Sequence, residues 1–251
     1  MYTPLALLSM ALAASNLVSA AALIPREVAA DEVIVFGAGN RYEVVKLAEW
    51  EAELAKDNLT LGRPDSPLDH PELITEFNAT ESEGSDIEKR CRNDRVITRN
   101  RDQDFLDWDT PLSSVIQSRG DGDSIAAQSG YSVGSSISVS AGVDLAFVKD
   151  YISASVSTTF EQNWSSQVST TYTLTIPKGQ KWAVMVSNPR TYRRSGFVKT
   201  GCIGSQRSNY FQADQRFPQR HQGLSWVQGV IRICSSKTYP IKFCIGNGSH
   251  R

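Results

Sequence analysis

The sequence has few of the side chains on which enzymes depend. Three histidines occur in 251 residues, and the part after Arg90 contains two of them, His221 and His250, with a single glutamate, Glu161. No G-x-S-x-G elbow, H-E-x-x-H pair or phosphate-binding glycine loop is present. Aspartates alone could support glycoside hydrolysis, but nothing in the composition favours it. The sequence therefore predicts a protein that is not an enzyme and has no metal or cofactor site.

Long apolar runs are also missing, because none approaches the roughly 20 residues that a membrane-spanning helix requires. The run from Leu5 to Leu17 is interrupted only by small polar residues and leads into Val18-Ser19-Ala20, a small-x-small pattern typical of signal-peptide cleavage. The start of this run carries no basic side chain. We interpret residues 1–20 as a signal peptide and expect a secreted, extracellular protein. Among its N-x-S/T sequons, we expect Asn163 and Asn247 to be glycosylated.

Cysteine is absent from the first 90 residues, and the four cysteines follow: Cys91, Cys202, Cys234 and Cys244. An even number in a secreted chain predicts two disulfides, for which three pairings are possible. A bond between Cys234 and Cys244 would staple two closing strands expected at 226–234 and 239–244, leaving Cys91 to pair with Cys202. The alternative, a metal site, lacks any C-x-x-C pair or matching histidine spacing.

The net charge of −1 conceals two oppositely charged parts. Residues 21–90 have 16 acidic and 7 basic side chains, a net charge of −9, whereas residues 91–251 have 11 acidic and 19 basic ones, a net charge of +8. The boundary falls at Lys89-Arg90, a dibasic pair of the kind that kexin-like proteases recognise. We therefore expect an acidic pro-segment over 21–90, cleavage after Arg90, and a mature disulfide-bonded β domain over 91–251.

The pro-segment has two patterned stretches. Residues 31–37 predict a short strand, and residues 41–54, with apolar side chains at Val44, Leu47, Ala48 and Leu54, predict a short amphipathic helix, whereas the composition beyond Leu61 is typical of disorder. Two roles stay open for it, an acidic spacer or a shield that keeps a basic mature domain inactive. Arg193-Arg194 is a second dibasic pair.

Residues 101–109 contain four aspartates among basic and aromatic residues. Paired carboxylates could serve acid–base chemistry or hold calcium, but the spacing does not follow an EF-hand loop. A solvated, salt-bridged turn with Phe105 and Trp108 in the core is the favoured interpretation.

Residues 131–186 contain the most informative pattern. Apolar side chains fall on odd positions up to Phe147, flip to even positions after Lys149-Asp150, and alternate largely with serine and threonine. Alternation with period two predicts strands with one apolar and one polar face, and these runs are much longer than ordinary strands. The predicted fold is all-β, an elongated antiparallel sheet or sandwich with long strands. A compact secreted β-sandwich, with bulges that interrupt the strands, is the alternative.

The stretch nearest Lys149-Asp150 has the length of membrane-crossing strands. Residues 137–147 and 151–161 are 11 residues each, which matches the roughly 9–11 that a tilted strand needs to cross a bilayer. We predict a hairpin over 137–161 whose exposed tip is Lys149 and Asp150. Its apolar row comprises Ile137, Val139, Val143, Leu145, Phe147, Ile152, Ala154 and Val156.

A family resemblance emerges at this point. The alternating run continues through Phe160-Glu161-Gln162-Asn163-Trp164-Ser165 into a Ser/Thr-rich strand that ends at Pro177-Lys178-Gly179-Gln180. Over about residues 130–187 this pattern resembles the aerolysin-like (epsilon-toxin/mosquitocidal-toxin) β-pore-forming proteins. The resemblance implies an amphipathic hairpin that refolds into a pair of barrel strands, and long strands that form an elongated stalk.

The expected function is that of a secreted toxin-like protein that perturbs membranes or forms pores through the 137–161 hairpin. Its partners would be target membrane lipid or a surface glycan or receptor, with homo-oligomers as the active form. The alternative is a non-enzymatic secreted effector or a glycan- or protein-binding β-sandwich. After Val186 the chain is rich in arginine and aromatics, but no nucleic-acid-binding motif is present and no nucleic-acid partner is expected.

Overall fold

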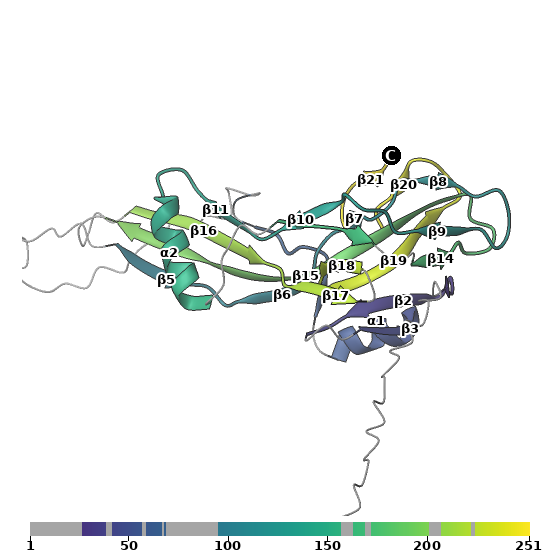
Figure 1. Cartoon of the computed structure of the whole chain (residues 1–251). Helices are drawn as coiled ribbons and strands as arrows, with labels where there is room; N and C mark the ends of the chain where they lie inside the picture. The colour runs from purple at the N-terminus through teal and green to yellow at the C-terminus, as the bar shows by residue number, and fades with distance from the viewer. Residues whose placement is uncertain are drawn as a thin grey trace, which may run out of the picture.

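The computed structural model describes residues 27–38, 42–56, 59–66, 68, 95–156, 163–168, 172–200, 207–221 and 224–251. Within them, strands are joined by two helices, α1 (Leu47–Lys56) and α2 (Leu145–Val156), in an elongated molecule (Figure 1). The all-β prediction is confirmed. Several predicted features lie outside the described residues: the signal peptide, Lys89 and Arg90, Cys91, Cys202, and residues 157–161 of the hairpin.

One strand, β15 (Trp182–Thr200), is the spine of the molecule. Its 19 residues correspond to about 60 Å of extended chain at roughly 3.3 Å per residue. One of its edges pairs antiparallel with β19 and then with β16, and the other pairs in succession with β8, β7, β6 and β5. The length of the molecule therefore follows from a single strand that is paired along both edges.

Eleven strands form the sheet built on β15. They are β2 (Glu32–Phe36), β3 (Tyr42–Lys46), β4 (Thr60–Leu61), β5 (Val96–Arg99), β6 (Gln103–Leu106), β7 (Thr110–Pro111), β8 (Ile116–Gln117), β11 (Ser136–Val139), β15, β16 (Arg207–Gln215) and β19 (Gly229–Ser236).

Smaller sheets pack around one half of this spine. They comprise β1 (Glu27–Val28), β14 (Thr173–Thr175) and β9 (Ser124–Ala126); β10 (Ser132–Gly134) with β12 (Asn163–Ser165); β13 (Gln167–Val168), β18 (Leu224–Val227) and β17 (Pro218–His221); and β20 (Ile241–Lys242) with β21 (Ser249–His250).

The main core lies at the end of the molecule where β15 pairs with β19. Alternate side chains of β15 enter different clusters there: Met185 packs with Leu174 and Trp226, whereas Val184 and Val186 pack with Ile241. Both faces of this half of β15 are thus buried. Because successive side chains of a strand point to opposite faces, this end of the molecule is a sandwich with layers on both sides of β15.

The predicted long strands at 131–147 and 152–176 are wrong in their continuity. Residues 132–139 form two short strands, residues 145–156 are helical, and residues 163–175 contribute β12, β13 and β14 to three different sheets. The alternation itself is correct over Tyr172, Leu174 and Ile176, which are buried while the residues between them are half-exposed. A two-residue period tells which face each residue takes but does not tell whether a strand continues in one sheet.

The long strand that does exist was not predicted, because Pro189 and Gly196 interrupt its pattern. Proline has no N–H for a ladder and is rare inside strands. Here Pro189 pairs with Gly229 at the end of β19, where the neighbouring strand changes, and its carbonyl oxygen accepts a 2.8 Å hydrogen bond from the Asp107 amide. The proline is thus accommodated at a break between two partners.

The described residues between 27 and 66, which belong to the predicted pro-segment, are part of the sheets, which the sequence did not indicate. β2 extends the sheet beyond β19, β3 lies outside β2, β1 pairs with β14, and β4 pairs with β6. The short strand predicted in this segment is present. The predicted helix is correct only in its second half, because α1 covers Leu47–Lys56 and residues 42–46 form strand β3. Residues 62–66, which composition placed in a disordered stretch, contact the sheet instead: the Pro64 carbonyl oxygen accepts from Arg193, and Ser66 donates to Gln212.

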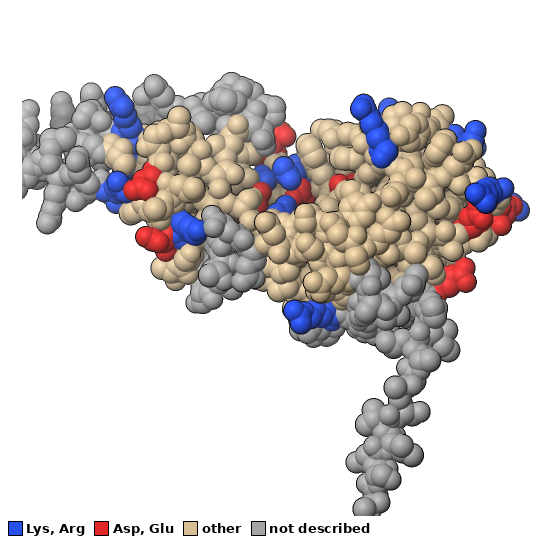
Figure 2. Space-filling view, turned by 45° about the horizontal axis from the view of Figure 1, so that its top comes forward, with Lys and Arg blue, Asp and Glu red and all other residues tan. Residues whose placement is uncertain are grey.

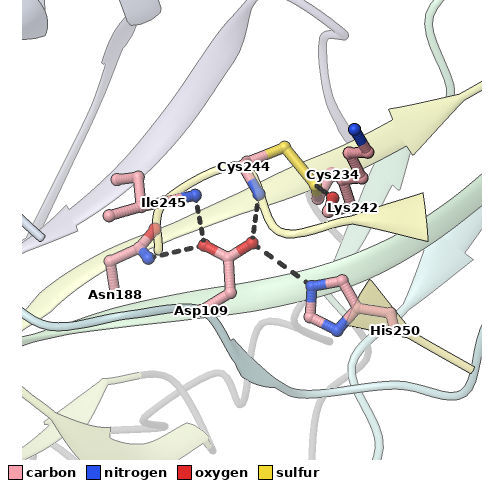
Figure 3. Close-up of a disulfide and its surroundings, with 7 residues drawn as sticks. All are labelled: Asp109, Asn188, Cys234, Lys242, Cys244, Ile245 and His250. Carbon is pink, nitrogen blue, oxygen red and sulfur yellow. Dashed lines mark hydrogen bonds and ion pairs between the residues drawn. A yellow bond between two sulfur atoms is a disulfide. The ribbon is translucent and has the colours of Figure 1, made fainter. Parts of the chain in front are cut away.

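The disulfide between Cys234 and Cys244 is present, as predicted for the closing strands. It ties β19 to a C-terminal loop that is also anchored by the buried Asp109 carboxylate (Figure 3). Asp109 accepts hydrogen bonds from the backbone amides of Cys244 (2.6 Å) and Ile245 (3.1 Å). His250 Nε2 lies 3.2 Å from the same carboxylate, so the loop is fixed by a covalent bond and a polar anchor.

Gly196 provides a test of the spine. A Cβ added there would overlap the carbonyl oxygen of Thr98 and lie 3.1 Å from the Phe211 ring. We expect Gly196→Ala to lower the free energy of unfolding by about 2 kcal/mol, because neither strand can move without losing its pairing. Gly120→Ala is the control, since nothing lies within 4 Å of its added Cβ. Denaturant unfolding measures both, and equal stability of the two variants would contradict the close approach.

Candidate functional site

The first candidate site is the place where β15 changes partners on both edges. On one edge β19 ends opposite Pro189 and β16 begins opposite Tyr192. On the other edge β6 ends opposite Arg190 and β7 begins opposite Ser187. We call residues 187–192 of β15 and the polar side chains around them the waist. Backbone groups that lose a strand partner must find another when buried, and the waist is accordingly filled with charged and amide side chains.

Arg193 is the most deeply buried cation next to the waist, with 1% of its surface exposed. Its guanidinium makes two hydrogen bonds to the Asp214 carboxylate, of 2.8 and 3.1 Å, and lies 4.9 Å from the centre of the Phe105 ring. A fully enclosed pair of this kind is bidentate and locks two neighbouring strands, β15 and β16. Its burial also makes the Arg193-Arg194 dibasic pair a poor protease site in the folded chain.

Asp107 is the carboxylate that joins three parts of the chain. Arg63 of the pro-segment donates to it through Nε (3.0 Å) and Nη2 (3.2 Å), and Arg216 reaches it from the end of β16. Burial by itself would raise the pKa of this carboxyl, but the hydrogen bonds from Arg63 and the charges of Arg216 and Arg63 outweigh burial and hold the pKa below its ordinary value.

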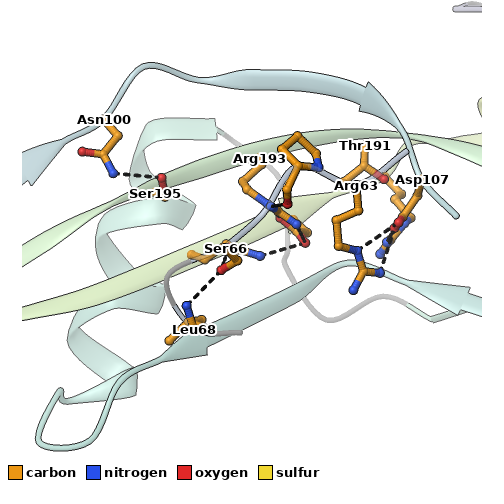
Figure 4. A network of polar contacts seen from close by, with 12 residues as sticks. Arg63, Ser66, Leu68, Asn100, Asp107, Thr191, Arg193 and Ser195 are labelled. Atoms are coloured by element: carbon orange, nitrogen blue, oxygen red, sulfur yellow. Dashed lines mark hydrogen bonds and ion pairs between the residues drawn. The ribbon is translucent and has the colours of Figure 1, made fainter. Parts of the chain in front are cut away.

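Two further residues of the pro-segment close this network (Figure 4). The carbonyl oxygen of Pro64 accepts a 2.9 Å hydrogen bond from Arg193 Nη1, and the Ser66 hydroxyl lies 2.6 Å from Gln212 Oε1. If the segment that contains Pro64 were removed, one N–H group of the buried Arg193 would lack an acceptor, and an unsatisfied buried donor lowers the free energy of unfolding. The pro-segment therefore completes the polar interior rather than covering it.

A polar cavity of about 400 Å³ lies between this network and strand β11. Its walls are Arg63 and Ser66 on the side of the pro-segment, Ser136 and Ser138 on β11, and Asp214 and Arg216 near β16. Figure 2 shows acidic and basic side chains gathered in a hollow between the two ends of the molecule, whereas most of the remaining visible surface is uncharged. The pro-segment and β11 thus face the same cavity.

The cluster at 101–109 is only partly the solvated turn that was expected. Asp102 and Asp104 pair with arginines at the surface, and Phe105 is in the core. Asp107 and Asp109 are buried, which corrects the expectation. Asp109 and the sulfur atoms of Cys234 and Cys244 lie within 4.8 Å of one another. These sulfurs are bonded to each other, and they therefore offer no thiolate ligands.

The second candidate site is the predicted hairpin, of which residues 137–156 are described. β11 is an edge strand that pairs with β16 over four residues, from Ser136 opposite Asp214 to Val139 opposite Phe211. A turn that contains Gly142, at φ +86, leads into α2. Residues 145–156 are therefore helical where the sequence predicted a strand, and Lys149 and Asp150 lie within α2 rather than at a hairpin tip.

The helix forms because the same residues also satisfy a helical period. Asp144 caps its first turn by accepting from the amides of Ala146 (3.0 Å) and Phe147 (3.4 Å). Val148 and Ile152, four residues apart, are buried on one face. A helical repeat mixes steps of three and four residues, and each step of three moves an apolar side chain from an odd to an even position. The phase flip at Lys149-Asp150 that suggested a hairpin tip is therefore also compatible with a helical pattern.

The buried face of this segment packs on the far end of the spine. Val148 and Ile152 contact a cluster with Val198, Phe211 and Ala213, and the partly buried Ile137, Val139, Val143 and Phe147 join it. Leu145, with 43% of its surface exposed, and Ala154 point away from it. The predicted apolar row is therefore split between a buried face and an exposed one. The side chain of Val156 lies outside the described residues.

Arg95 contacts the start of α2 at the surface. Arg95 Nη1 lies 2.7 Å from the Asp144 carboxylate, and its guanidinium lies 5.1 Å from the centre of the Phe147 ring. Both charged side chains are more than 40% exposed, so that water screens the attraction between them and the pair is weak.

Neither helix in the described part of the chain has the length and apolar character needed to cross a membrane as a helix. Asn163 and Asn247, the two sequons expected to be glycosylated, both have exposed side chains.

Sequence reasoning did not find the waist, because its members come from positions 63–66, 107, 193 and 212–216, which only the fold brings together. The charge reversal between the two parts of the chain was the one available signal. A scan against protein-family models finds no match, and searches of curated proteins and of solved structures find no significant match either.

The buried carboxylates predict acid sensitivity. The pKa of Asp107 and that of Asp109 are both lowered in the folded chain; for Asp109, burial opposes the shift but hydrogen bonds from His250 and Asn188 outweigh it. Their stabilisation is present above the unfolded pKa of about 3.9 and is lost as the pH falls through the lower folded values. Denaturant unfolding should therefore give a free energy that decreases below about pH 4.

Asp107→Asn should lower stability at pH 7 by about 3 kcal/mol, because it leaves buried arginine charge uncompensated, and should flatten the decrease at low pH. Asp121→Asn is the control, since Asp121 pairs with Lys178 at the surface. A wild-type profile that is flat from pH 5 to pH 2 would rule out this role for the carboxylates.

Proposed function

We propose that the protein is secreted, is cleaved after Arg90, and perturbs or forms pores in target membranes through residues 137–161. The activity is non-enzymatic: the inserting segment contacts lipid, and several copies assemble in the active form. The proposal retains the aerolysin-like mechanism that the resemblance implies, with the segment starting from a helix-containing form.

The position of the segment is the observation that carries this proposal. β11 is an edge strand and α2 rests on one apolar cluster at the far end of β15. Release therefore breaks the pairing of β11 with β16 and the hydrogen bonds from Ser140 to the Tyr210 carbonyl oxygen. It also breaks the apolar contacts of the segment with the cluster at the end of β15 and the exposed Arg95–Asp144 pair. The sandwich core and the disulfide at the opposite end do not need to open. A segment that moves must come from the less stable parts of a structure.

The sequence of the segment supports a second, extended form. Written as strands, it presents Ile137, Val139 and Val143 on one side, with Ser138 and Ser140 on the other. Membrane-crossing strands require this alternation of lipid-facing and water-facing residues. The helix uses only part of the apolar row, which leaves the rest available to lipid.

A static secreted effector or binding protein is the second candidate. The observation that favours it is the close packing of α2, which already buries Val148 and Ile152 in the described form. The two candidates differ in whether the segment must leave the sheet.

A disulfide that locks β11 to β16 distinguishes the two candidate functions. Ile137 and Ala213 are direct antiparallel partners, and such pairs have Cα atoms about 4.5–5.5 Å apart, within the range of a disulfide. We expect the oxidised double variant Ile137→Cys/Ala213→Cys to release dye from phospholipid vesicles at least about tenfold more slowly than either single variant, because the closed bond prevents the release that insertion requires.

The single-cysteine variants control for the substitutions themselves. Wild-type protein cleaved at Arg90 should release dye at micromolar concentration from vesicles that contain lipid of the target membrane. Cleaved protein that neither oligomerises nor causes leakage would refute the pore-forming function, and undiminished leakage from the locked protein would exclude this segment as the inserting one.

A further inference from the structure

The contacts of residues 27–66 have a consequence that does not depend on any membrane activity. We infer that this segment stays bound after the chain is cut behind Arg90, so that the processed protein is a non-covalent complex of two chains. The argument rests on three kinds of contact, which involve the sheet, the core and the waist.

The sheet contact is continuous with the main sheet. Strand β2 pairs with β19 from Phe36 opposite Gly229 to Ile34 opposite Ile231, and β4 pairs with β6. Removal of the segment would leave β19 as an open edge that is buried on both faces. Such edges recruit other strands.

The core contact lies on both sides of β2. Val28, Ile34 and Phe36 belong to the main core together with Met185, Leu174 and Trp226. On the other face Trp50 and Leu54 of α1 pack with Leu106 and Val230, and Trp50 is only 4% exposed. These side chains interdigitate with the rest of the core, and cleavage of a distant peptide bond does not alter their burial.

The polar contact is the waist. When the segment leaves, three side chains of the remaining chain lose a hydrogen-bond partner. Arg63, the Pro64 carbonyl and Ser66 are the partners that leave, and Asp107, Arg193 and Gln212 are the side chains that lose them. Asp107, Arg193 and Gln212 are all buried. Departure therefore uncovers apolar surface and leaves buried charged groups short of a partner in the same step.

Two features of the sequence make separation of residues 27–66 from the rest of the chain easy to detect. No cysteine precedes Cys91, and therefore no disulfide can join the two chains after a cut at Arg90. Trp50 is the only tryptophan before that cut, so that its emission changes if the segment is released. Association after cleavage consequently measures non-covalent binding alone.

To test this inference, the full chain is cut with a dibasic-specific protease. The cut protein is then run on a size-exclusion column without denaturant. Both fragments should elute in one peak at the size of the uncut protein, and guanidinium should separate them without any reductant. Elution of the segment by itself from native buffer would overturn the inference. Pore formation is not measured, so this outcome is independent of the proposed function.

Two charge variants test the contact surface. Arg63→Ala removes the pair with Asp107, and the cut complex should dissociate roughly 10-fold to 100-fold more readily, as the loss of a buried charge-assisted bond predicts. Lys46→Ala is the matched control, because Lys46 pairs with Asp31 and Glu32 inside the segment, and it should stay within about twofold of wild type. Equal weakening by the two variants would overturn the assigned surface.

Thermal unfolding before cleavage shows whether Arg63→Ala still folds. If it does not, Ser66→Ala removes only the hydrogen bond to Gln212 and should weaken the cut complex about fivefold. A cut Ser66→Ala complex as tight as wild type would then exclude this part of the waist from the interface.

Discussion

The pairing of β15 along both edges is the constraint on which the rest of the structure depends. Because one strand runs the length of the molecule, each end is a separate arrangement of shorter strands hung on the same backbone. The neighbours must therefore change somewhere, and they change at the same place on both edges, around residues 187–192. Proline at position 189 marks the break, and polar side chains from other segments fill it. The elongated shape and the buried charges are thus two consequences of one strand.

Buried ion pairs contribute little net stability when they are compared with well-packed apolar residues, because desolvation offsets their attraction. Their effect at the waist is on specificity. Arg193 and Asp214 fix the register of β15 against β16, and Asp107 pairs at once with Arg216, which directly follows β16, and with Arg63 of the N-terminal segment. A chain without the pro-segment could still form its apolar clusters in part, but it could not satisfy this site. The charge difference between the two parts of the chain is therefore realised in specific contacts, as well as in their overall attraction.

The sequence predicted the all-β class, the closing disulfide, the strand at 32–36 and the second half of the helix at 47–56, because each shows in local periodicity or in the number and spacing of the cysteines. Residues 42–46, predicted as helix, form strand β3 instead. It did not predict β15, whose proline and glycine are acceptable only where a partner strand ends or where the Thr98 carbonyl approaches. It also did not predict that residues 27–66 belong to the sheet, since edge pairing depends on an open neighbour that a sequence does not display. The waist was out of reach for the same reason: its charged residues are distant in the chain and have ordinary surface composition.

The wrong prediction at α2 has a different cause, because the local strand pattern of residues 145–156 conflicts with the helix that they form. Residues 145–156 alternate well enough for a strand, and they also place Val148 and Ile152 at a helical spacing behind an Asp144 cap. In sequences with one well-defined native state, the local structural preference of each segment tends to agree with the fold. Disagreement between the two is concentrated at functional or strained sites. Burial on the end of β15 decides in favour of the helix while the segment is docked. Only part of the strand pattern is used in that packing: Ile152 and Phe147 join the cluster, whereas Leu145 and Ala154 face outward. The described part of the segment therefore fits both a helix-containing and an extended form, which is the property that the proposed insertion of residues 137–161 requires.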